Sequence, residues 1–176
     1  FKVKVQDYVT KIEVNPNSVT GTYNEELSSV ITNNNIKYTV TYASAGAKTP
    51  EALTDDMVTG YNKTSTTAQN LTVKYTDNDV DSYTNGQEFT TDLEVTLMNT
   101  VSGITITKPS KSTYKHGEDI DLTGGEINLT YEDGTTGKLN ISNATITEAD
   151  GSEVNMSPAV SDYTNNKVDK VLKIEY

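Results

Sequence analysis

The stretch INLTYEDGTTGKLNI, residues 127–141, contains the features that decide the fold. Its apolar residues alternate with polar ones on both sides of Glu132-Asp133-Gly134. Alternation with a period of two places one face of a β-strand on a core and the other in water. Asp-Gly is typical of the tight turn of a β-hairpin. The stretch therefore predicts two antiparallel strands joined by a short turn.

The same period of two recurs almost everywhere that apolar residues cluster. Lys, Thr, Glu and Asn mostly occupy the intervening positions, so one face of each predicted strand is wet, as antiparallel sheets allow. Only residues 50–57 suggest a helix. We therefore expect an all-β chain. The predicted strands centre on Phe1-Val3-Val5, Ile12-Val14, Ile36-Tyr38-Val40-Tyr42, Leu71-Val73-Tyr75, Leu93-Val95-Leu97, Ile104-Ile106, Ile127-Leu129-Tyr131, Leu139-Ile141 and Leu172-Ile174-Tyr176.

Composition favours two small domains over one. The chain has 176 residues, of which 34% are hydrophobic, and its aromatic residues are 11 Tyr and 2 Phe without any Trp. A core built from such residues is thin, and two β-sandwiches of fewer than about 100 residues each need less core than one large domain.

Charge excludes several classes of partner. Fourteen basic residues, all Lys, stand against 25 acidic ones, which gives a net charge of -11. Nucleic acids and anionic membrane surfaces require clustered positive charge, so neither is an expected partner. There is no Cys, which excludes disulfides and thiolate chemistry. No apolar run is long enough to cross a membrane, so we expect no membrane insertion.

The strand pattern repeats along the chain, which is a sign of tandem modules. Six apolar residues between Phe1 and Val14 match six between Leu93 and Ile106 at a constant shift of 92 residues. Later matches follow in the same order. They are Tyr23 with Tyr114, Tyr42 with Tyr131, Val58-Thr59-Gly60-Tyr61 with Val160-Ser161-Asp162-Tyr163, and Leu71-Thr72-Val73-Lys74-Tyr75 with Leu172-Lys173-Ile174-Glu175-Tyr176.

These matches divide the chain into three parts. Residues 1–6 correspond to the last strand of a preceding repeat, residues 7–98 form a first repeat, and residues 99–176 form a second repeat that stops before its own last strand. Two explanations remain for the missing strand. Either further sequence supplies it, or residues 1–6 of another chain fill the gap.

The second repeat resembles a known family. Pro109, Tyr114-Lys115-His116-Gly117-Glu118-Asp119-Ile120, Gly124-Gly125 and Leu129-Thr130-Tyr131-Glu132-Asp133-Gly134-Thr135 resemble the third group of bacterial immunoglobulin-like (Ig-like) domains. The first repeat departs from the pattern, with Glu25-Glu26 in place of Gly-Glu and Ala43-Ser44-Ala45-Gly46 in place of the Asp-Gly hairpin. The resemblance implies two tandem Ig-like Greek-key β-sandwiches.

The resemblance also implies a function by analogy at the level of the fold. Modules of this family stand in tandem on secreted or wall-attached bacterial proteins, so we expect an extracellular, non-catalytic spacer or stalk segment whose partners are neighbouring repeats of the same polypeptide. The alternative is an adhesion module that binds a carbohydrate or a host surface protein. A cluster of exposed Tyr in a shallow groove of one repeat would favour the alternative.

One loop suggests a metal site. Asp77, Asp79 and Asp81 alternate along a polar segment, which is the spacing by which calcium loops gather oxygen ligands. Asp119, Asp121, Asp55 and Asp56 show weaker versions of this pattern, and no other cofactor is indicated. His116 is the single imidazole and stands in a turn beside Gly117. We expect no catalytic residues and no enzyme.

Tyrosines at matched positions of the two repeats are expected to pack in the core or at strand ends, whereas Tyr8 and Tyr83 are unmatched.

The final expectation concerns association. In residues 1–6, Phe1, Val3 and Val5 form an apolar face and Lys2, Lys4 and Gln6 a polar one. An open sandwich edge recruits strands. We therefore predict that Phe1–Gln6 pairs with the edge near Leu172–Tyr176 of a neighbouring copy, which gives head-to-tail contacts.

Overall fold

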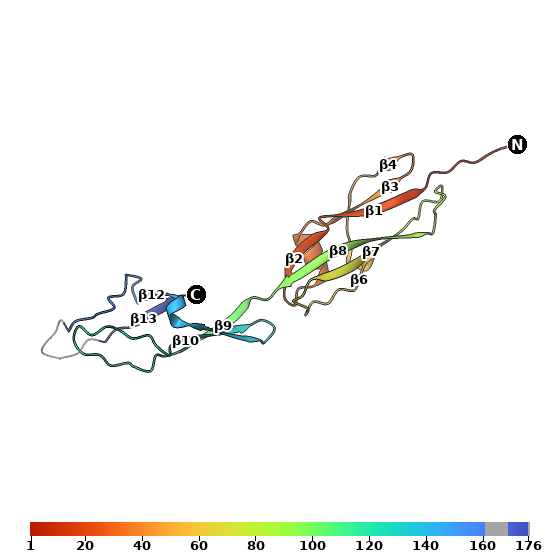
Figure 1. Ribbon diagram of the computed structural model, residues 1–176. Coiled ribbons are helices and arrows are strands. Elements are labelled where there is room, and N and C mark those ends of the chain that lie inside the picture. The colour runs from red at the N-terminus through yellow and green to blue at the C-terminus, as the bar shows by residue number, and fades with distance from the viewer. Residues whose placement is uncertain (161–168, 176) are drawn as a thin grey trace. The chain divides into compact units, whose positions relative to one another are not determined.

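The computed structural model describes residues 1–160 and 169–175, and the chain folds into two units, Phe1–Thr100 and Val101–Tyr176. Both units are built from β-sheets, which confirms the predicted all-β, Ig-like fold class (Figure 1). The last strand of unit 1 ends at Met98 and the first strand of unit 2 begins at Val101, so two residues join them.

Unit 1 contains two sheets (Figure 1). In the first sheet, β3 pairs antiparallel with β1 on one edge and with β4 and β5 on the other. In the second sheet, β8 lies between β2, which is parallel to it, and β7, which is antiparallel and also carries β6. The bounds are β1 Val9–Asn15, β2 Ser18–Thr22, β3 Lys37–Tyr42, β4 Gly46–Ala47, β5 Glu51–Ala52, β6 Val58–Thr59, β7 Gln69–Thr76 and β8 Glu88–Met98.

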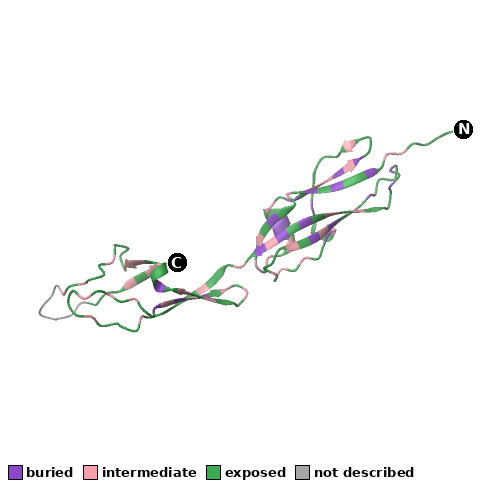
Figure 2. Ribbon diagram, in the orientation of Figure 1, coloured by how far each residue is buried: buried purple, intermediate pink, exposed green. Residues whose placement is uncertain are grey.

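The core of unit 1 is formed by alternate residues of both sheets. Leu93, Val95 and Leu97 of β8 are buried, while the residues between them face outward or are partly exposed. Figure 2 shows this alternation of buried and exposed positions along the strands of unit 1. The alternation is the period of two that the sequence predicted, because each strand presents one face to the core.

The predicted helix at residues 50–57 is wrong. Only Asp55–Met57 forms a short 3-10 turn, η1, and residues 51–52 belong to β5. The helix of unit 1 is α1, Leu27–Asn33, which buries Val30 and Ile31. Ser, Thr, Asn and β-branched residues favour a helix weakly, so the burial of its apolar face decides the outcome here.

Residues 1–6 form no strand within the part of the chain that the structure describes. Phe1, Val3 and Val5 are exposed. Lys4 forms an ion pair with Asp81 at 3.2 Å, and the Gln6 amide donates to the Asp81 carbonyl at 3.0 Å. The apolar face of this segment therefore has the pattern of a sandwich strand without a sheet to cover it.

Unit 2 contains a three-stranded sheet in the order β11-β10-β9 and a two-stranded sheet of β12 and β13 (Figure 1). The predicted Asp-Gly hairpin is confirmed, since Gly134 has a φ of +81° and its amide donates to the Tyr131 carbonyl. The small core is Ile127, Leu129 and Ile141. The bounds are β9 Val101–Thr107, β10 Glu126–Tyr131, β11 Thr136–Asn140, η2 Ile141–Asn143, β12 Thr145–Glu148 and β13 Leu172–Glu175.

The first two long strands of each unit pair in the same register. Ile12 lies opposite Val40 in unit 1, and Ile104 lies opposite Leu129 in unit 2. Each pair also has one irregularity at the same place, next to the Val9–Tyr42 pair in unit 1 and next to the corresponding Val101–Tyr131 pair in unit 2. The sequence match between the units thus extends to strand pairing.

The correspondence between the two units does not extend to the strand that pairs with β7 in unit 1 and with β13 in unit 2. Val58 pairs with Val73 in unit 1, and in unit 2 the residue opposite Ile174 is Ile146 rather than Val160. Residues 161–163 and 176, which the sequence comparison also used, lie outside the described residues. The two-stranded sheet of unit 2 therefore uses β12 where the sequence alignment pointed to residues near 160.

The core position of β8 gives a first prediction. Replacing Leu93 by Ala removes a fully buried side chain and leaves a cavity, so the free energy of unfolding of unit 1 should fall by about 2–5 kcal/mol. Hydrogen exchange of the β7 and β8 amides measures this loss. Met98→Ala is the control because Met98 is exposed at the end of the same strand. Equal effects of the two substitutions would contradict the assigned core.

Candidate functional site

A groove of about 340 Å³ opens on unit 1. It is lined by β3, by Lys48 and Thr49 of the segment that connects β4 to β5, by Glu51 of β5, and by Tyr75 of β7. Tyr38 and Tyr75 are half-buried and Tyr42 is buried, so the walls of the groove are aromatic. Its lining residues are Tyr38, Val40, Tyr42, Lys48, Thr49, Glu51 and Tyr75.

Each ring of the groove has a defined partner. The Tyr38 and Tyr75 ring centroids are 5.9 Å apart and the rings are tilted by 40°, a separation typical of favourable aromatic pairs. The Lys48 ammonium lies 4.9 Å from the centroid of the Tyr42 ring, within the range of a cation–π contact. The Tyr38 hydroxyl donates to the Glu51 carboxylate at 2.8 Å.

The tyrosines of the groove are neutral over the physiological range. Burial, together with the Glu51 carboxylate, raises the pKa of Tyr38 to about 12. Burial also raises the pKa of Tyr42 and of Tyr75. All three phenols therefore keep their protons, and Tyr38 and Tyr42 donate theirs to Glu51 and Asp77. Lys48 and Glu51 supply one charge of each sign at the rim.

This arrangement suits binding. Small-molecule sites in proteins are mostly clefts of about 300–1,000 Å³ with aromatic walls and a few polar groups, and the groove lies at the lower end of that range. Tyrosine offers an apolar ring face and a polar tip together. A ligand with an apolar ring face and several hydroxyl groups fits these properties.

The groove has no full counterpart among the described residues of unit 2. The residue that matches Tyr38 is Ile127, which is buried in the core. Tyr131 matches Tyr42, while the match of Tyr75 is Tyr176, which lies outside the described residues. The aromatic pair of Tyr38 and Tyr75 is thus specific to unit 1 in the part of the chain that can be compared.

The predicted calcium ligands lie in the loop between β7 and β8, where they make hydrogen bonds. Asp77 is fully buried. Its carboxylate accepts from the Thr84 hydroxyl at 2.7 Å and from the Tyr42 hydroxyl at 3.1 Å. Asp79 accepts from the Asp81 amide at 2.9 Å, and Asp81 pairs with Lys4. The structure therefore places the three carboxylates in one loop but gives each of them a different partner.

The weaker metal candidates are also engaged elsewhere. Among residues 1–160 and 169–175, no three His, Cys, Asp or Glu side chains are grouped so that they could hold a metal ion. Asp119 accepts from Ser157 and Asp121 from the Thr123 amide. Asp55 and Asp56 lie in the η1 turn. The calcium hypothesis at Asp77, Asp79 and Asp81 remains a prediction.

Asp77 is the centre of a buried hydrogen-bond network. Thr84 extends this network to β1, because its hydroxyl also accepts a hydrogen bond from the Val9 amide at 3.0 Å. Burial by itself would raise the pKa of the Asp77 carboxyl, but hydrogen bonds from Ser82, Thr84, the Asp79 amide and Tyr42 lower it below its ordinary value. The carboxylate is thus ionised at neutral pH and ties the loop to β1 and β3.

Asp7 has a similar structural role, because its carboxylate holds the turn between β3 and β4. Its carboxylate accepts from the Ser44 amide at 3.0 Å and from the Ala45 amide at 2.9 Å. Desolvation opposes ionisation, but these hydrogen bonds prevail and lower the pKa of Asp7 to about 2. Asp7 therefore stabilises the segment Ala43–Gly46, which replaces the Asp-Gly turn of unit 2.

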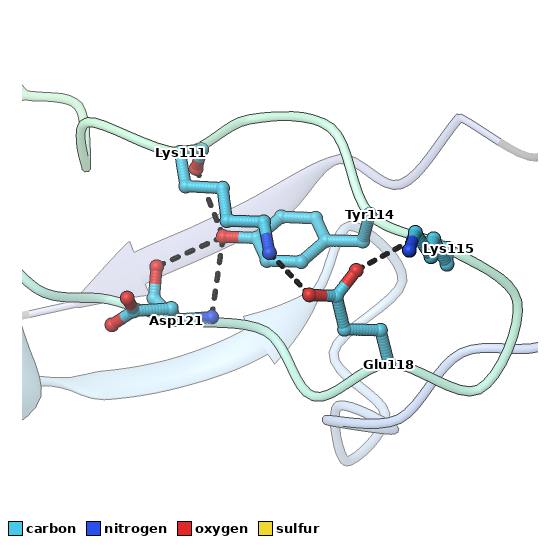
Figure 3. Close-up of polar contacts among 5 residues, drawn as sticks. All are labelled: Lys111, Tyr114, Lys115, Glu118 and Asp121. Carbon is cyan, nitrogen blue, oxygen red and sulfur yellow. Dashed lines mark hydrogen bonds and ion pairs between the residues drawn. The ribbon is translucent and has the colours of Figure 1, made fainter.

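In unit 2, hydrogen bonds and an ion pair hold together the loop between β9 and β10, as Figure 3 shows. We call these contacts the loop clamp, and its residues are Lys111, Tyr114, Lys115, Glu118 and Asp121. The Tyr114 hydroxyl lies 2.9 Å from the carbonyl oxygens of Lys111 and of Asp121, and it accepts from the Asp121 amide at 3.2 Å. Glu118 accepts from the Lys115 amide at 2.8 Å and forms an ion pair with Lys111. Every contact drawn joins parts of the same loop, so these residues have a structural role.

The part of this clamp that Gly117 and Glu118 form also exists in unit 1, at a position that the sequence comparison missed. Gly117, with a φ of +73°, precedes Glu118, and Asn24, with a φ of +64°, precedes Glu25. Glu25 accepts from the Thr22 amide at 2.8 Å, three residues earlier, as Glu118 does from Lys115. The counterpart of Gly-Glu is therefore Asn24-Glu25 and not Glu25-Glu26.

His116 lies in the predicted turn and is exposed. Its Nδ1 accepts a hydrogen bond from the Val160 amide at 3.0 Å. This contact gives the imidazole a structural role in holding the chain near residue 160.

The tyrosines divide as the repeat predicted. Those at matched positions that the structure describes are buried or half-buried, namely Tyr23, Tyr42, Tyr61, Tyr75, Tyr114 and Tyr131. The unmatched Tyr8 and Tyr83 are exposed. Tyr163 and Tyr176 lie outside the described residues.

Sequence reasoning did not find the groove. It joins Tyr38 to Tyr75, which are far apart in the chain, and its charged residues follow the turn at Gly46 in a segment that lacks a regular pattern. The available signal was Tyr38 itself, since it is a tyrosine where the matched position of unit 2 has an isoleucine.

Comparison with known families agrees with the fold of unit 2. Residues 107–172 match the family Bacterial Ig-like domain (group 3), which confirms the resemblance seen in the sequence of the second repeat. Domains of this family occur in bacterial surface proteins and are in general non-catalytic. No curated protein matches the sequence. In the described part of the chain, no helix has the length and apolar character that crossing a membrane requires.

The buried carboxylate gives a second prediction. Asp77→Asn replaces an ionised acceptor by a neutral amide, so the free energy of unfolding of unit 1 should fall by about 1–3 kcal/mol at pH 7. Because the pKa of Asp77 is lowered in the folded state, its contribution is present above the unfolded pKa and is lost as the pH falls through the folded value. The difference in the free energy of unfolding between the wild type and Asp77→Asn should therefore become smaller at acidic pH.

Urea unfolding at several pH values measures this difference. Asp92→Asn is the matched control, because Asp92 is exposed on β8. A loss of stability in Asp77→Asn that is no larger than in the control would contradict the role assigned to the network.

Proposed function

We propose that the chain is a non-catalytic, extracellular spacer segment of a bacterial surface protein. The observation that carries this proposal is the common register of β1 with β3 and of β9 with β10, including the irregularity at the Val9 and Val101 pairs. Unit 2 matches an Ig-like family that occurs in surface proteins. The shared register supports the view that unit 1 is a second module of the same kind.

A series of such modules lengthens a surface protein without adding a catalytic site. The two-residue connection from Met98 to Val101 is shorter than most connections between elements, which supports a segment with little slack. The net charge of -11 favours solubility and repulsion between neighbouring chains.

Pulling on single molecules tests the spacer. We expect two separate unfolding events in a molecule held at its two ends, because each unit has its own core. At about 3.5 Å per residue, full extension is about 35 nm for Phe1–Thr100 and about 27 nm for Val101–Tyr176. Leu93→Ala should lower the unfolding force of only the longer event, which is the unfolding of unit 1. A chain that extends without resistance would contradict a spacer that holds its length under tension.

The groove of unit 1 supports a second candidate function, the binding of a carbohydrate. Three neutral phenols, one ammonium and one carboxylate surround a small cleft, and hydroxyl-rich rings offer both a face for stacking and groups for hydrogen bonding. This candidate is compatible with the first, because a spacer module can also carry an adhesive site.

A glycan array tests the second candidate. If the groove is the site, Glu51→Gln should weaken binding of any glycan that is found by about tenfold, since a hydrogen bond to a charged group is lost. The matched control is Glu88→Gln, which also removes an exposed carboxylate paired with a neighbour, Lys74, outside the groove. A blank array, or equal loss in both variants, would count against a carbohydrate site here.

A further inference from the structure

The hydrogen bonds of the tyrosine groove in unit 1 make its walls attractive to a cation. Tyr42 donates its hydroxyl hydrogen to the buried Asp77 carboxylate at 3.1 Å, and Tyr38 donates to Glu51 at 2.8 Å. Two of the three rings that line the groove therefore belong to phenols bonded to a carboxylate. Such a bond moves electron density toward the ring, and an electron-rich ring face is a better partner for a cation.

Carboxylates also dominate the charge around the third ring. Burial raises the pKa of Tyr75, and the carboxylates of Asp77, Glu51 and Asp79 raise it further. Charges that hinder the loss of a proton favour a positive group at the same place. Among the described residues that line the groove, Lys48 is the only cation. The groove is therefore a negative site in a chain whose net charge is -11.

Lys48 already brings an ammonium group into this groove. Its Nζ lies 4.9 Å from the centroid of the Tyr42 ring. Within the part of the chain that the structure describes, Lys48 forms no ion pair, whereas Lys63 pairs with Glu26. Lys48 is exposed, so its side chain can turn into water with little loss of packing. The ring face thus holds an ammonium that a ligand can displace.

An acidic ligand fits the groove less well than a cationic one. Its negative charge would lie near the carboxylates of Glu51 and Asp77 and would meet the negative face of the Tyr42 ring. The single charge of Lys48 offsets only part of this repulsion. A neutral sugar gains contact with the rings and hydrogen bonds, and a sugar with a positive charge gains electrostatic attraction as well.

We propose that the groove binds an amino sugar whose ammonium takes the place of the Lys48 ammonium over the Tyr42 ring. This proposal rests on the carbohydrate candidate for the same groove and adds a charge to its ligand. The sugar ring lies among the tyrosines, and Lys48 turns toward water. Because the groove measures about 340 Å³, which is near the lower end for small-molecule sites, one sugar ring is the unit that it recognises.

Lys48 then acts as an internal competitor and not as a contact of the ligand. The free groove holds its own cation, and the ammonium of the ligand displaces it. Cation–π contacts at exposed sites are weak, so this competition lowers the affinity only a few-fold. Removing the charge of Lys48 should therefore strengthen the binding of an amino sugar, whereas removing a lysine that contacts the ligand would weaken it.

Three single-ring probes of different charge test the proposal. They are the methyl glycosides of glucosamine, glucose and glucuronic acid, titrated into the full-length chain in mildly acidic buffer, where the glucosamine amine is protonated. NMR signals of the tyrosine rings give the dissociation constants and locate the site. The glucosamine glycoside should bind about threefold or more tighter than the glucose glycoside, and the glucuronide should bind most weakly. Added salt should reduce this difference.

Lys48→Gln tests the displacement of the internal cation. The affinity for the glucosamine glycoside should rise about two- to fivefold, while that for the glucose glycoside stays nearly the same. Lys63→Gln is the matched control, because it removes the same charge from a lysine that pairs with Glu26 outside the groove. A weaker binding of the glucosamine glycoside by Lys48→Gln, or an equal gain in Lys63→Gln, overturns the proposal.

Glu51→Gln tests the carboxylate at the rim. The preference for the glucosamine glycoside over the glucose glycoside should decrease in this variant, because one of the negative charges around the groove is lost. Glu88→Gln, whose carboxylate pairs with Lys74 outside the groove, should keep the preference of the wild type. An unchanged preference in Glu51→Gln contradicts the proposed attraction.

The outcomes distinguish this proposal from the carbohydrate candidate on which it rests. Equal binding of the glucosamine and glucose glycosides overturns the amino sugar and leaves a site for neutral carbohydrate. If none of the three glycosides binds, the carbohydrate site is refuted and the amino sugar with it. Tetramethylammonium that binds as tightly as the glucosamine glycoside also overturns the amino sugar, because the sugar ring then contributes nothing.

Discussion

The contact between the inner face of β8 and the opposite sheet is the interaction on which unit 1 depends. Leu93, Val95 and Leu97 are fully buried there, and each such side chain contributes roughly 1.5–3 kcal/mol relative to an exposed one. A sandwich with few aromatic side chains has little other apolar surface to bury. The position of one strand thus decides whether Ile12 and Val14 lie in a core or in water.

Tyrosine takes the place of larger apolar residues at the margins of this thin core. Its ring packs on the sheet while its hydroxyl reaches a polar group, as Tyr42 does with Asp77 and Tyr61 with the Glu25 carbonyl. Because each hydroxyl needs a partner, these residues bring carboxylates to the edges of the sandwich. The groove beside Tyr38 and Tyr75 has the same origin, since phenylalanine would not hold Glu51 at its rim.

Regular alternation and turn chemistry could be predicted from the sequence, because both are local. The hairpin of β10 and β11 at Asp133-Gly134 follows from a period of two and one turn. Helix α1 was missed because its intrinsic propensity is low and the burial of Val30 and Ile31 decides it. The groove was missed because it depends on the contact of two distant strands. For Asp77, the sequence shows the spacing of the carboxylates, which gives the calcium hypothesis, but it does not show the hydroxyl groups of Tyr42 and Thr84 that donate to Asp77.

The loop clamps of the two units show that the residues of a motif can differ between repeats while the backbone conformation and the hydrogen bond that they form stay the same. The task requires a residue that tolerates a positive φ, followed by a carboxylate that accepts the backbone amide three residues earlier. Gly117-Glu118 meets both requirements in unit 2, and Asn24-Glu25 meets them in unit 1, since Asn is among the few residues other than Gly that adopt this conformation readily. In unit 2, Glu118 also pairs with Lys111, which comes earlier in the same loop, whereas in unit 1 the neighbouring Glu26 pairs with Lys63, which comes much later in the chain. The two units therefore share the turn and its carboxylate but not the ion pair, and a residue-by-residue comparison of letters misses the part that is shared.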